Sequence, residues 1–339
     1  MRAMVVRRPR PIRDSPVEPC ELPIPEPGPG EVRVRVEVCG VCRTDLHVAE
    51  GDLPPRRDRI VPGHEVVGRV DSLGRGARGP AVGDRVGVAW LHRACGDCRF
   101  CRTGAENLCL TPRFTGWDAD GGYAEYLTAP ADFVHPLPES LPARATAPLL
   151  CAGIIGHRAY VRSGARPGGR LGLWGFGGSA HIVIQIARHF RNQVFVFSRG
   201  GAHRELAEEL GADWVGDSFE KSPAPLDAAI LFAPAGGLVL PALEALDRGG
   251  VLAIAGIHLS SVPPLDYRRH LFQEREIRSV TANTRADARE LLRLAQAIPI
   301  RTHTVPYPLE RAGDALADLA QDRIRGAAVL QVAGDAEPT

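Results

Sequence analysis

The sequence lacks an excess of charge of either sign. Its 339 residues include 41 lysine and arginine residues and 40 aspartate and glutamate residues, which gives a formal net charge of +1. Strongly basic proteins attract nucleic acid and anionic membranes, and this balance gives no reason to expect either partner. We therefore expect a small-molecule ligand, with no nucleic acid and no membrane surface.

Long hydrophobic runs are also missing. The longest are far shorter than the roughly 20 apolar residues that a membrane-spanning helix needs. The N-terminal stretch MRAMVVRRPRPIRDS carries charge but has neither the apolar segment nor the cleavage pattern of a signal peptide. These absences predict a cytoplasmic protein. Its length favours two domains, and its hydrophobic content of 44% is enough for a sizeable core.

Lysine is almost absent, since Lys221 is the single lysine among the 41 basic residues. The codon usage of a GC-rich genome accounts for such a bias. Thermal adaptation is the alternative, although replacement of lysine by arginine is an inconsistent sign of it. The bias therefore predicts nothing about function.

Cysteine is sparse but unevenly distributed. Four of the eight cysteines follow the spacing C-x2-C-x2-C-x7-C, at Cys95, Cys98, Cys101 and Cys109. Four thiolates gathered by tight turns make a closed tetrahedral shell for zinc, with Zn–S distances of roughly 2.3 Å, and leave no position for a substrate. We predict a structural zinc lobe over residues 92–112. An iron–sulfur cluster and a disulfide pair are the alternatives.

A second set of candidate ligands is scattered along the chain: Cys42, His64 and Cys151. Two thiolates and one imidazole, with a fourth position left for water or substrate, form a catalytic zinc arrangement. Cysteines used as metal ligands favour a reducing compartment. Cys20 and Cys39 remain as spectators. A Cys39-x-x-Cys42 redox pair is the alternative, but it lacks the surrounding βαβ pattern.

The apolar pattern changes at about residue 150. Before it, alternating residues and turn signals predict strands in the segments 31–38, 83–88 and 121–127. After it, strands are expected at 171–174, 193–197, 226–232 and 251–256. Helical patterns separate these later strands, and this alternation predicts a doubly wound parallel sheet. A helix over 288–297 and a strand over 326–332 are expected to return the chain to the first domain.

A glycine turn, GFGGSA, follows the first strand of the later region and opens a helix. Its glycines permit a tight turn and the close approach of a pyrophosphate to the helix N-terminus, where free N–H groups favour anions. We predict that a nicotinamide dinucleotide is bound by Gly175, Gly177, Gly178 and Ser179.

The end of the next strand bears on the choice of dinucleotide. An acidic residue there would bind the ribose 2′-hydroxyl of NAD, but the sequence has Ser198 and Arg199. No carboxylate is present to repel a 2′-phosphate, and Arg199 is able to pair with one. The sequence therefore favours NADP over NAD. The alternative is that Arg199 stacks on the adenine while NAD binds.

Five segments together, CGVCRTDLH, GHEVVG, the four-cysteine lobe, LLCAGI and GFGGSA, resemble the zinc-dependent medium-chain alcohol dehydrogenases. The resemblance runs from about residue 3 to residue 332. It implies an α/β protein with a GroES-like irregular β domain over 1–151 and 291–339, and a Rossmann domain over 152–290. It also implies two Zn²⁺ per chain. The implied reaction is reversible hydride transfer between an alcohol and a nicotinamide cofactor through a zinc-bound alkoxide.

The resemblance assigns roles to residues around the proposed catalytic zinc. Thr44 matches the hydroxyl that starts a proton relay, and His47 matches the outer end of that relay. Asp45 is expected to orient His64 and to raise its basicity. Glu65 is expected near the metal, where it is able to exchange with a ligand.

Further roles follow from position. Arg43 fits the residue that meets the cofactor pyrophosphate, with an exposed surface arginine as the alternative. Trp90, Leu91 and Trp117 flank the zinc lobe and are candidates for an apolar pocket suited to medium-length or aromatic primary alcohols, although large aromatics are also common in cores. We expect a homodimer or homotetramer joined through an edge strand near residues 251–257.

Other classes fit the sequence less well. Polyol dehydrogenases of this fold resemble a pattern with a carboxylate in place of Cys151, and zinc-free quinone reductases lack the ligands. A non-catalytic dinucleotide-binding protein would show a broken ligand or relay position, and none is broken. The direction of the reaction cannot be read from residues, although a preference for NADP would favour reduction.

Overall fold

The chain forms two compact units in the computed structural model, which describes residues 1–333. Unit 1 comprises Met1–Cys151, Ala282–Gln296 and the chain from Thr302 onward. Unit 2 comprises Ala152–Thr281 and Ala297–Arg301. The expected first boundary, between residues 151 and 152, coincides with the observed one.

The expected second boundary, at residue 291, lies inside helix α9 (Arg285–Ala297). The chain returns to unit 1 earlier, at Ala282, because the apolar side of α9 packs there: Leu292 shares a buried cluster with Val67 and Val329. Residues 334–339, which were counted with the first domain, lie outside the described residues.

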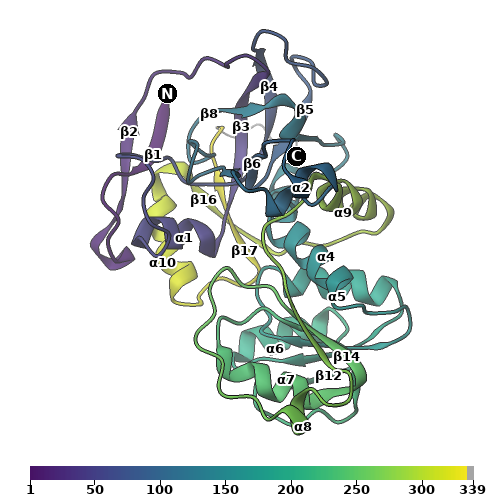
Figure 1. The fold of residues 1–339 in the computed structure, drawn as a ribbon. Coiled ribbons are helices and arrows are strands. Elements are labelled where there is room, and N and C mark those ends of the chain that lie inside the picture. Colours follow the sequence, from purple (N-terminus) through teal and green to yellow (C-terminus); the bar gives the residue numbers. More distant parts are fainter. Residues whose placement is uncertain (334–339) are drawn as a thin grey trace. The chain divides into compact units, whose positions relative to one another are not determined.

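Unit 1 is built on a mixed sheet with the order β16-β17-β3-β4-β5-β9, in which β8 also pairs with β3. Its strands are β3 (Glu31–Val41), β4 (Glu65–Leu73), β5 (Arg85–Val88), β8 (Tyr126–Pro130), β9 (Val134–Pro136), β16 (Thr304–Pro308) and β17 (Ala327–Gln331). Figure 1 shows the C-terminal β17, in yellow, beside the N-terminal β3, which it pairs in antiparallel fashion.

Smaller elements complete unit 1. Two short sheets pair β1 (Arg2–Val6) with β2 (Val17–Glu21), and β6 (Leu91–Arg93) with β7 (Arg113–Phe114). The helices are α1 (Arg43–Glu50), α2 (Arg99–Arg102), α3 (Ala143–Thr146), α9 and α10 (Ala312–Ala320). The 3-10 turns are η1 (Ile12–Asp14), η2 (Glu106–Leu108), η3 (Ala131–Phe133), η4 (Ala147–Leu150) and η6 (Leu309–Arg311).

The strand prediction for unit 1 is correct in one place and partly wrong in another. In β3 the alternating Val32, Val34 and Val36 are buried, as period-two patterning predicts. The strand expected over 121–127 begins only at Tyr126. Residues 121–123 instead bond to the loop before β4: the N–H of Gly121 donates to the carbonyl of Val61 at 2.7 Å.

Unit 2 contains a six-stranded sheet in which every neighbouring pair is parallel. Its order, β12-β11-β10-β13-β14-β15, is that of a doubly wound dinucleotide-binding fold and confirms the prediction. The strands are β10 (Arg170–Trp174), β11 (Gln193–Phe197), β12 (Trp214–Gly216), β13 (Leu226–Leu231), β14 (Leu246–Ile254) and β15 (Glu276–Ser279). The helices are α4 (Ala152–Arg162), α5 (Ala180–His189), α6 (Gly201–Glu209), α7 (Val239–Ala245) and α8 (Tyr267–His270), with the 3-10 turn η5 (Gly236–Leu238).

The predicted sheet edge near residues 251–257 is wrong. Those residues fall largely in β14, which has parallel neighbours on both sides, β13 and β15. The edge strand is β15, whose four residues carry too little apolar pattern to be recognised as a strand.

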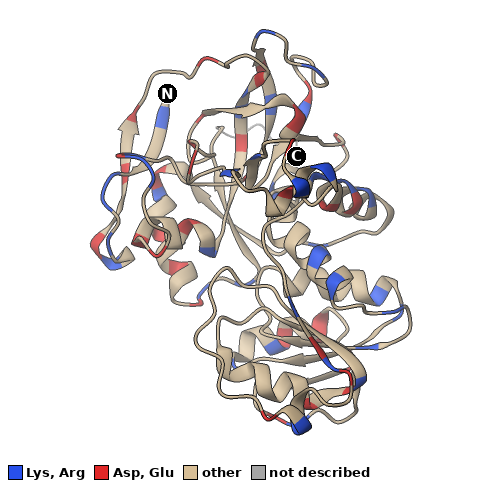
Figure 2. Ribbon diagram, viewed as in Figure 1, with Lys and Arg blue, Asp and Glu red and all other residues tan. Residues whose placement is uncertain are grey.

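Charges of both signs are interspersed over the chain (Figure 2). No helix within residues 1–333 is both long and apolar enough to cross a bilayer.

A partly buried ion pair joins the four-cysteine lobe to α9 inside unit 1. The carboxylate of Glu106 accepts from the backbone N–H and from Nε of Arg285, both at 3.1 Å. Glu106→Ala removes this acceptor and should lower the free energy of unfolding by about 1–3 kcal/mol. Scanning calorimetry would measure it, with Glu310→Ala as control because the Arg2–Glu310 pair is exposed. Equal losses in the two variants would contradict the prediction.

Candidate functional site

The structure gathers one thiol, imidazole or carboxylate atom from each of Cys42, His64, Glu65 and Cys151 within 4.8 Å of one another. Cys42 is the N-cap of α1, His64 and Glu65 meet at the start of β4, and Cys151 follows η4. The sulfur atoms of Cys42 and Cys151 are 3.9 Å apart. Two thiolates on one tetrahedral ion, each at roughly 2.3 Å, would be roughly 3.8 Å apart. The cluster therefore fits a single metal ion.

The imidazole of His64 is oriented for metal binding. Its Nδ1 lies 2.9 Å from Oδ1 of Asp45, and both side chains are fully buried. Donation from Nδ1 to the carboxylate leaves Nε2 as the atom with a free lone pair. Nε2 is buried and has no hydrogen-bond partner in the described structure. An orphaned acceptor beside two thiols is accounted for by a metal ion.

The electrostatics of the cluster also favour a cation. Hydrogen bonding with Cys151, together with the neighbouring His64, lowers the pKa of Cys42 well below its usual value. The same contact with Cys42, together with burial, raises the pKa of Cys151 well above its usual value. Burial opposes charge on His64, but Asp45 and Cys42 raise its pKa on balance. Two thiols and two carboxylates in a buried space thus make a site for a divalent cation.

Asp45 holds the cluster together through four donors. Its Oδ1 accepts from Nδ1 of His64 and from the backbone N–H of Gly63 at 3.1 Å. Its Oδ2 accepts from the backbone N–H of Cys42 at 2.9 Å and from the hydroxyl of Tyr123 at 3.3 Å. The first of these Oδ2 bonds is half of a capping box at the start of α1. Tyr123 was not among the predicted site residues.

The Glu65 carboxylate reaches the cluster because residue 40, opposite it in the sheet, is a glycine. Residues Gly40 and Glu65 are paired between β3 and β4. A Cβ at position 40 would lie 1.9 Å from Oε2 of Glu65, so a side chain there would displace the carboxylate from the cluster.

The two predicted relay residues, Thr44 and His47, and the predicted pyrophosphate contact Arg43 belong to α1. The hydroxyl of Thr44 lies 3.7 Å from the sulfur of Cys42, which places it beside the cluster. Nδ1 of His47 lies 2.8 Å from the carboxylate of Asp52, a partner that the sequence analysis missed. Arg43 pairs with Asp322.

The candidate pocket residues are aromatic neighbours of the cluster. The ring of Trp90 meets that of His64 edge-on at 5.0 Å and stacks on that of Trp117 at 6.1 Å. The guanidinium of Arg56 lies 3.7 Å over the ring of Trp117. Leu91 is buried in β6 and paired with Phe114, whose ring also stacks on Trp90. Phe114 and Arg56 carried no sequence signal, because only the folded chain brings them to the tryptophans.

The second cluster consists of the four cysteines of the lobe, Cys95, Cys98, Cys101 and Cys109. The sulfur of Cys101 lies 3.8 Å from that of Cys95 and 3.5 Å from that of Cys98. A disulfide needs about 2.05 Å, so these thiols are not bonded to one another. Their close grouping fits one ion rather than a multi-iron cluster, which would hold the sulfurs farther apart.

Backbone N–H groups point at the lobe sulfurs. Those of Cys101 and Leu110 lower the pKa of Cys98 to about 6, whereas burial and the neighbouring thiols raise the pKa of Cys101 to about 12. Donors of this kind stabilise the thiolate form that binds a metal.

In unit 2 the glycine turn joins the carboxyl end of β10 to α5. The strand order reverses between β10 and β13, and ligands of this fold bind at such a reversal. Gly175 has a φ of +85°, and a Cβ there would lie 2.9 Å from the backbone nitrogen of Ala233. A Cβ on Gly177 would meet nothing within 4 Å. Gly178 and Ser179 follow directly before α5. The surface over Gly177 is therefore open to a ligand.

Ser198 and Arg199 lie beside this turn. They follow β11, which pairs with β10, and the N–H of Gly175 donates to the carbonyl of Phe197 at 2.8 Å. Ser198 is buried and Arg199 is exposed. The first turn of α6, which comes next, contains no acidic residue.

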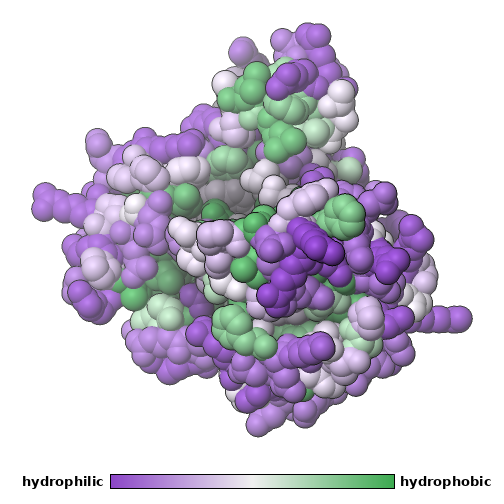
Figure 3. Space-filling model, turned by 60° about the horizontal axis from the view of Figure 1, so that its bottom comes forward, coloured by the Kyte–Doolittle hydropathy of each residue, from purple (hydrophilic) through white to green (hydrophobic). Residues whose placement is uncertain are grey.

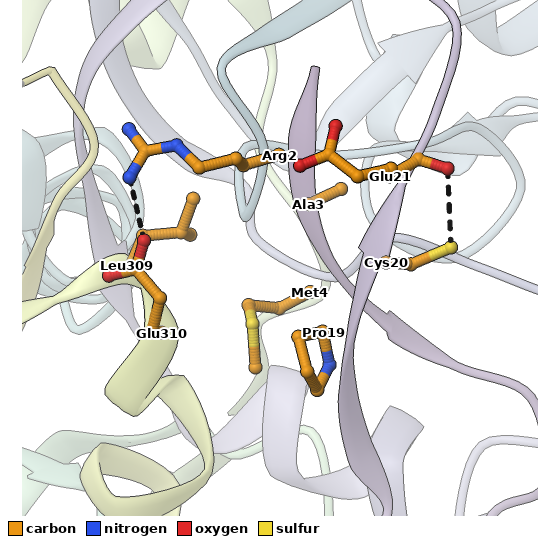
Figure 4. A pocket seen from close by; sticks show the side chains of 8 residues that line it. All are labelled: Arg2, Ala3, Met4, Pro19, Cys20, Glu21, Leu309 and Glu310. Carbon is orange, nitrogen blue, oxygen red and sulfur yellow. Dashed lines mark hydrogen bonds and ion pairs between the residues drawn. The ribbon is translucent and has the colours of Figure 1, made fainter.

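A cavity of about 270 Å³ lies elsewhere in unit 1, between β1, β2 and η6. Figure 4 shows its lining, in which Arg2 reaches across to Glu310. None of its lining residues belongs to either cysteine cluster.

Comparisons with known proteins agree with this geometry. Residues 28–139 match the family model of the alcohol dehydrogenase GroES-like domain, and residues 178–297 match that of zinc-binding dehydrogenases. The chain is 56% identical over 337 residues to a probable alcohol dehydrogenase, AdhA, of Mycobacterium tuberculosis, covering 98% of this chain and 97% of the relative. It is 34% identical over 327 residues to an alcohol dehydrogenase of Geobacillus stearothermophilus, covering 94% and 97%.

Among solved structures, a cinnamyl alcohol dehydrogenase of Sorghum bicolor superimposes with a TM-score of 0.90 at 29% identity, covering 100% of this chain and 99% of the other. The two family models together span most of the chain, and the relatives are matched nearly end to end. The chain belongs to the zinc-binding medium-chain alcohol dehydrogenases.

Proposed function

We propose that this protein is a two-zinc alcohol dehydrogenase that interconverts a small primary or secondary alcohol with its aldehyde or ketone and prefers NADP. The observation that carries the proposal is the cluster of Cys42, Cys151 and the fully buried His64, with an orphaned imidazole nitrogen and sulfurs at the spacing of one tetrahedral ion. Three ligands leave a fourth position for substrate. The four-cysteine lobe would hold the second, structural zinc.

Catalytic zinc supplies a Lewis acid that lowers the pKa of an alcohol, while the nicotinamide accepts or gives hydride. The chain's own residues position these groups and move the proton. Thr44, beside the sulfur of Cys42, is placed to accept the proton of the substrate hydroxyl. His47 would pass that proton to solvent, and its Asp52 partner holds the ring in place. Asp45 orients His64, and Glu65 adds negative charge beside the ligands.

The nicotinamide cofactor would lie over the glycine turn, with its pyrophosphate at Gly177, Gly178 and Ser179 and with Arg43 as a further phosphate contact. Support for NADP comes from the segment after β11, where an exposed arginine and a buried serine stand without a carboxylate in the following turn. A 2′-phosphate would pair with Arg199 and accept from Ser198. A likeness to an acetophenone reductase of Geotrichum candidum solved with NAD, at 25% identity, supports the nicotinamide class.

The substrate would lie along the aromatic side chains next to His64. Trp90 and Trp117 stack with their planes only 9° apart, and Trp90 is in contact with the ligand histidine. An apolar wall of this kind favours medium-length or aromatic primary alcohols over polyols. Leu91 would contribute to the same wall.

We also propose a cytoplasmic homo-oligomer, a dimer or a tetramer, whose dimer contact is the edge strand β15. Unpaired edge strands are templates for another chain. Large apolar side chains in the segment that leads into β15, and one in β15 itself, are exposed: Ile257, Val262, Leu265, Tyr267, Phe272 and Ile277. Figure 3, in which the bottom of Figure 1 comes forward, shows apolar side chains, in green, scattered among polar ones on the face that it presents. Cysteines used as metal ligands support a reducing compartment.

The two cysteine clusters should respond differently to loss of one ligand. Cys42→Ser should abolish turnover and leave one zinc per chain, because the lobe is unaffected. Cys98→Ser should instead lower the thermal stability of the protein, because the lobe loses its closed shell. Zinc content, steady-state rates and thermal unfolding measured on both variants would test this. Identical behaviour of the two variants would refute the division into catalytic and structural sites.

The cofactor preference can be measured as kcat/KM for benzyl alcohol with NAD and with NADP. We expect a clear preference for NADP in the native protein. Arg199→Ala should lower kcat/KM with NADP by about 10- to 100-fold, the loss expected for a charge-assisted contact, and should change the NAD value little. The control is Arg248→Ala. Arg248 is exposed and lies near the start of β14, at the opposite end of the parallel sheet from the glycine turn. A native preference for NAD would reduce Arg199 to a stacking residue.

Oligomerisation through β15 predicts a specific sensitivity. Ile277→Lys would place charges in the contact between two β15 strands and should shift the protein towards the monomer in analytical ultracentrifugation. Ile24→Lys alters a comparably exposed isoleucine in unit 1 and should leave the assembly intact. If Ile277→Lys sedimented like the native oligomer, another surface would have to form the contact.

A further inference from the structure

We propose that Tyr123 is a positioning residue for the catalytic metal: its hydroxyl holds the Asp45 carboxylate in the orientation that directs Nε2 of His64 at the ion. The inference rests on the proposed catalytic zinc and deepens it. It assigns a function to Gly121-Gly122-Tyr123, a segment that the sequence pattern indicated only as the start of a strand.

The segment is fastened to the loop that carries His64. The N–H groups of Gly121, Gly122 and Tyr123 donate to the carbonyls of three consecutive loop residues, Val61, Gly63 and Pro62, at 2.7, 2.9 and 3.0 Å respectively. The backbones approach so closely that a Cβ on Gly121 would lie 2.0 Å from the carbonyl oxygen of Gly63. The position of Tyr123 relative to His64 is therefore set by the backbone.

The ring of Tyr123 fills the space that a side chain at Gly63 would need. Gly63 has a φ of +99°, and a Cβ there would lie 2.4 Å from Cδ1 of Tyr123. Tyr123 is completely buried. The neighbouring atoms therefore hold the ring in one position, in which its hydroxyl donates to Asp45.

The hydroxyl completes the bonding of the carboxylate. Oδ1 of Asp45 is engaged by His64 and Gly63, and Oδ2 is engaged by the N–H of Cys42 and by the Tyr123 hydroxyl. Two donors on each oxygen fix the rotation of the carboxylate plane. Burial, followed by the charge of Asp45, raises the pKa of Tyr123 well above its usual value, so the hydroxyl stays protonated and donates.

Removing this bond should weaken the metal site without disturbing the packing. Tyr123→Phe keeps the ring that packs on Gly63 and deletes the hydroxyl alone. Partners that orient metal-bound histidines typically contribute 10- to 100-fold to metal affinity, and one 3.3 Å bond among four should contribute about three- to tenfold. Asp45 and His64 retain their other contacts, so the protein should still fold and bind zinc.

The test is a chelator competition on zinc-loaded protein, in which zinc release is followed with a chromophoric chelator. The release step that is absent from Cys42→Ser identifies the catalytic ion. Tyr123→Phe should shift that step about three- to tenfold towards lower chelator concentration and leave release from the four-cysteine lobe unchanged. Thermal unfolding of the same samples separates an effect on the site from a general loss of stability.

Tyr307→Phe is the matched control. Its hydroxyl donates to a carboxylate oxygen of Asp318 at 2.6 Å, so the variant deletes the same kind of bond from unit 1, between β16 and α10. It should leave both zinc-release steps in place. An unchanged catalytic step in Tyr123→Phe, or an equal shift in Tyr307→Phe, would overturn the inference while the proposed function stands. Native protein without the catalytic release step would overturn both.

Discussion

The hydrogen bonding of the buried Asp45 carboxylate is the constraint on which the candidate metal site depends. An ionised carboxylate in the interior is costly in free energy unless hydrogen bonds replace its lost water. Here the required donors come from the first turn of α1, from the loop before β4, from the ring of His64 and from Tyr123. Satisfying the hydrogen bonds of one carboxylate therefore brings together segments that are far apart in sequence, and two of the proposed metal ligands, Cys42 and His64, lie on those segments.

The sequence predicted those parts of the candidate site in which the type of side chain alone indicates the function. Thiolates and imidazoles are the side chains that bind zinc, so Cys42, His64 and Cys151 could be named as candidate ligands, and the four lobe cysteines are close enough in sequence to mark a site by spacing alone. The doubly wound sheet was predictable because β10, β11 and β13 are nearly continuous apolar runs, as buried parallel strands must be.

What escaped prediction depends on contacts rather than on patterns. In the sequence Tyr123 fits the alternating pattern of a strand. No sequence pattern indicates that its backbone instead forms hydrogen bonds with the loop at residues 61–63. The strand β15 escaped because it lies at an edge and needs no apolar face on both sides. Arg43 was expected to be available to a phosphate, and its pairing with Asp322 joins α1 to the segment after α10, a contact with no local signal.

The two cysteine clusters would use the same kind of thiol ligand in different surroundings. In the lobe Cys95 is exposed, Cys98 and Cys101 are partly buried and Cys109 is buried. Backbone N–H groups stabilise these sulfurs, such as that of Cys98 on the sulfur of Cys95 at 3.3 Å. Thiolates that are exposed or partly exposed are tolerable in water, so the main effect of an ion there would be to hold the loop closed. Around Cys42 and Cys151, which are partly buried, the side chains of His64, Asp45 and Glu65 are almost completely buried, and the two carboxylates add negative charge. An ion bound there would have to neutralise its surroundings as well as bind to them. Because electrostatic interactions are stronger in such a space, a small change in the orientation of one partner is felt at the metal.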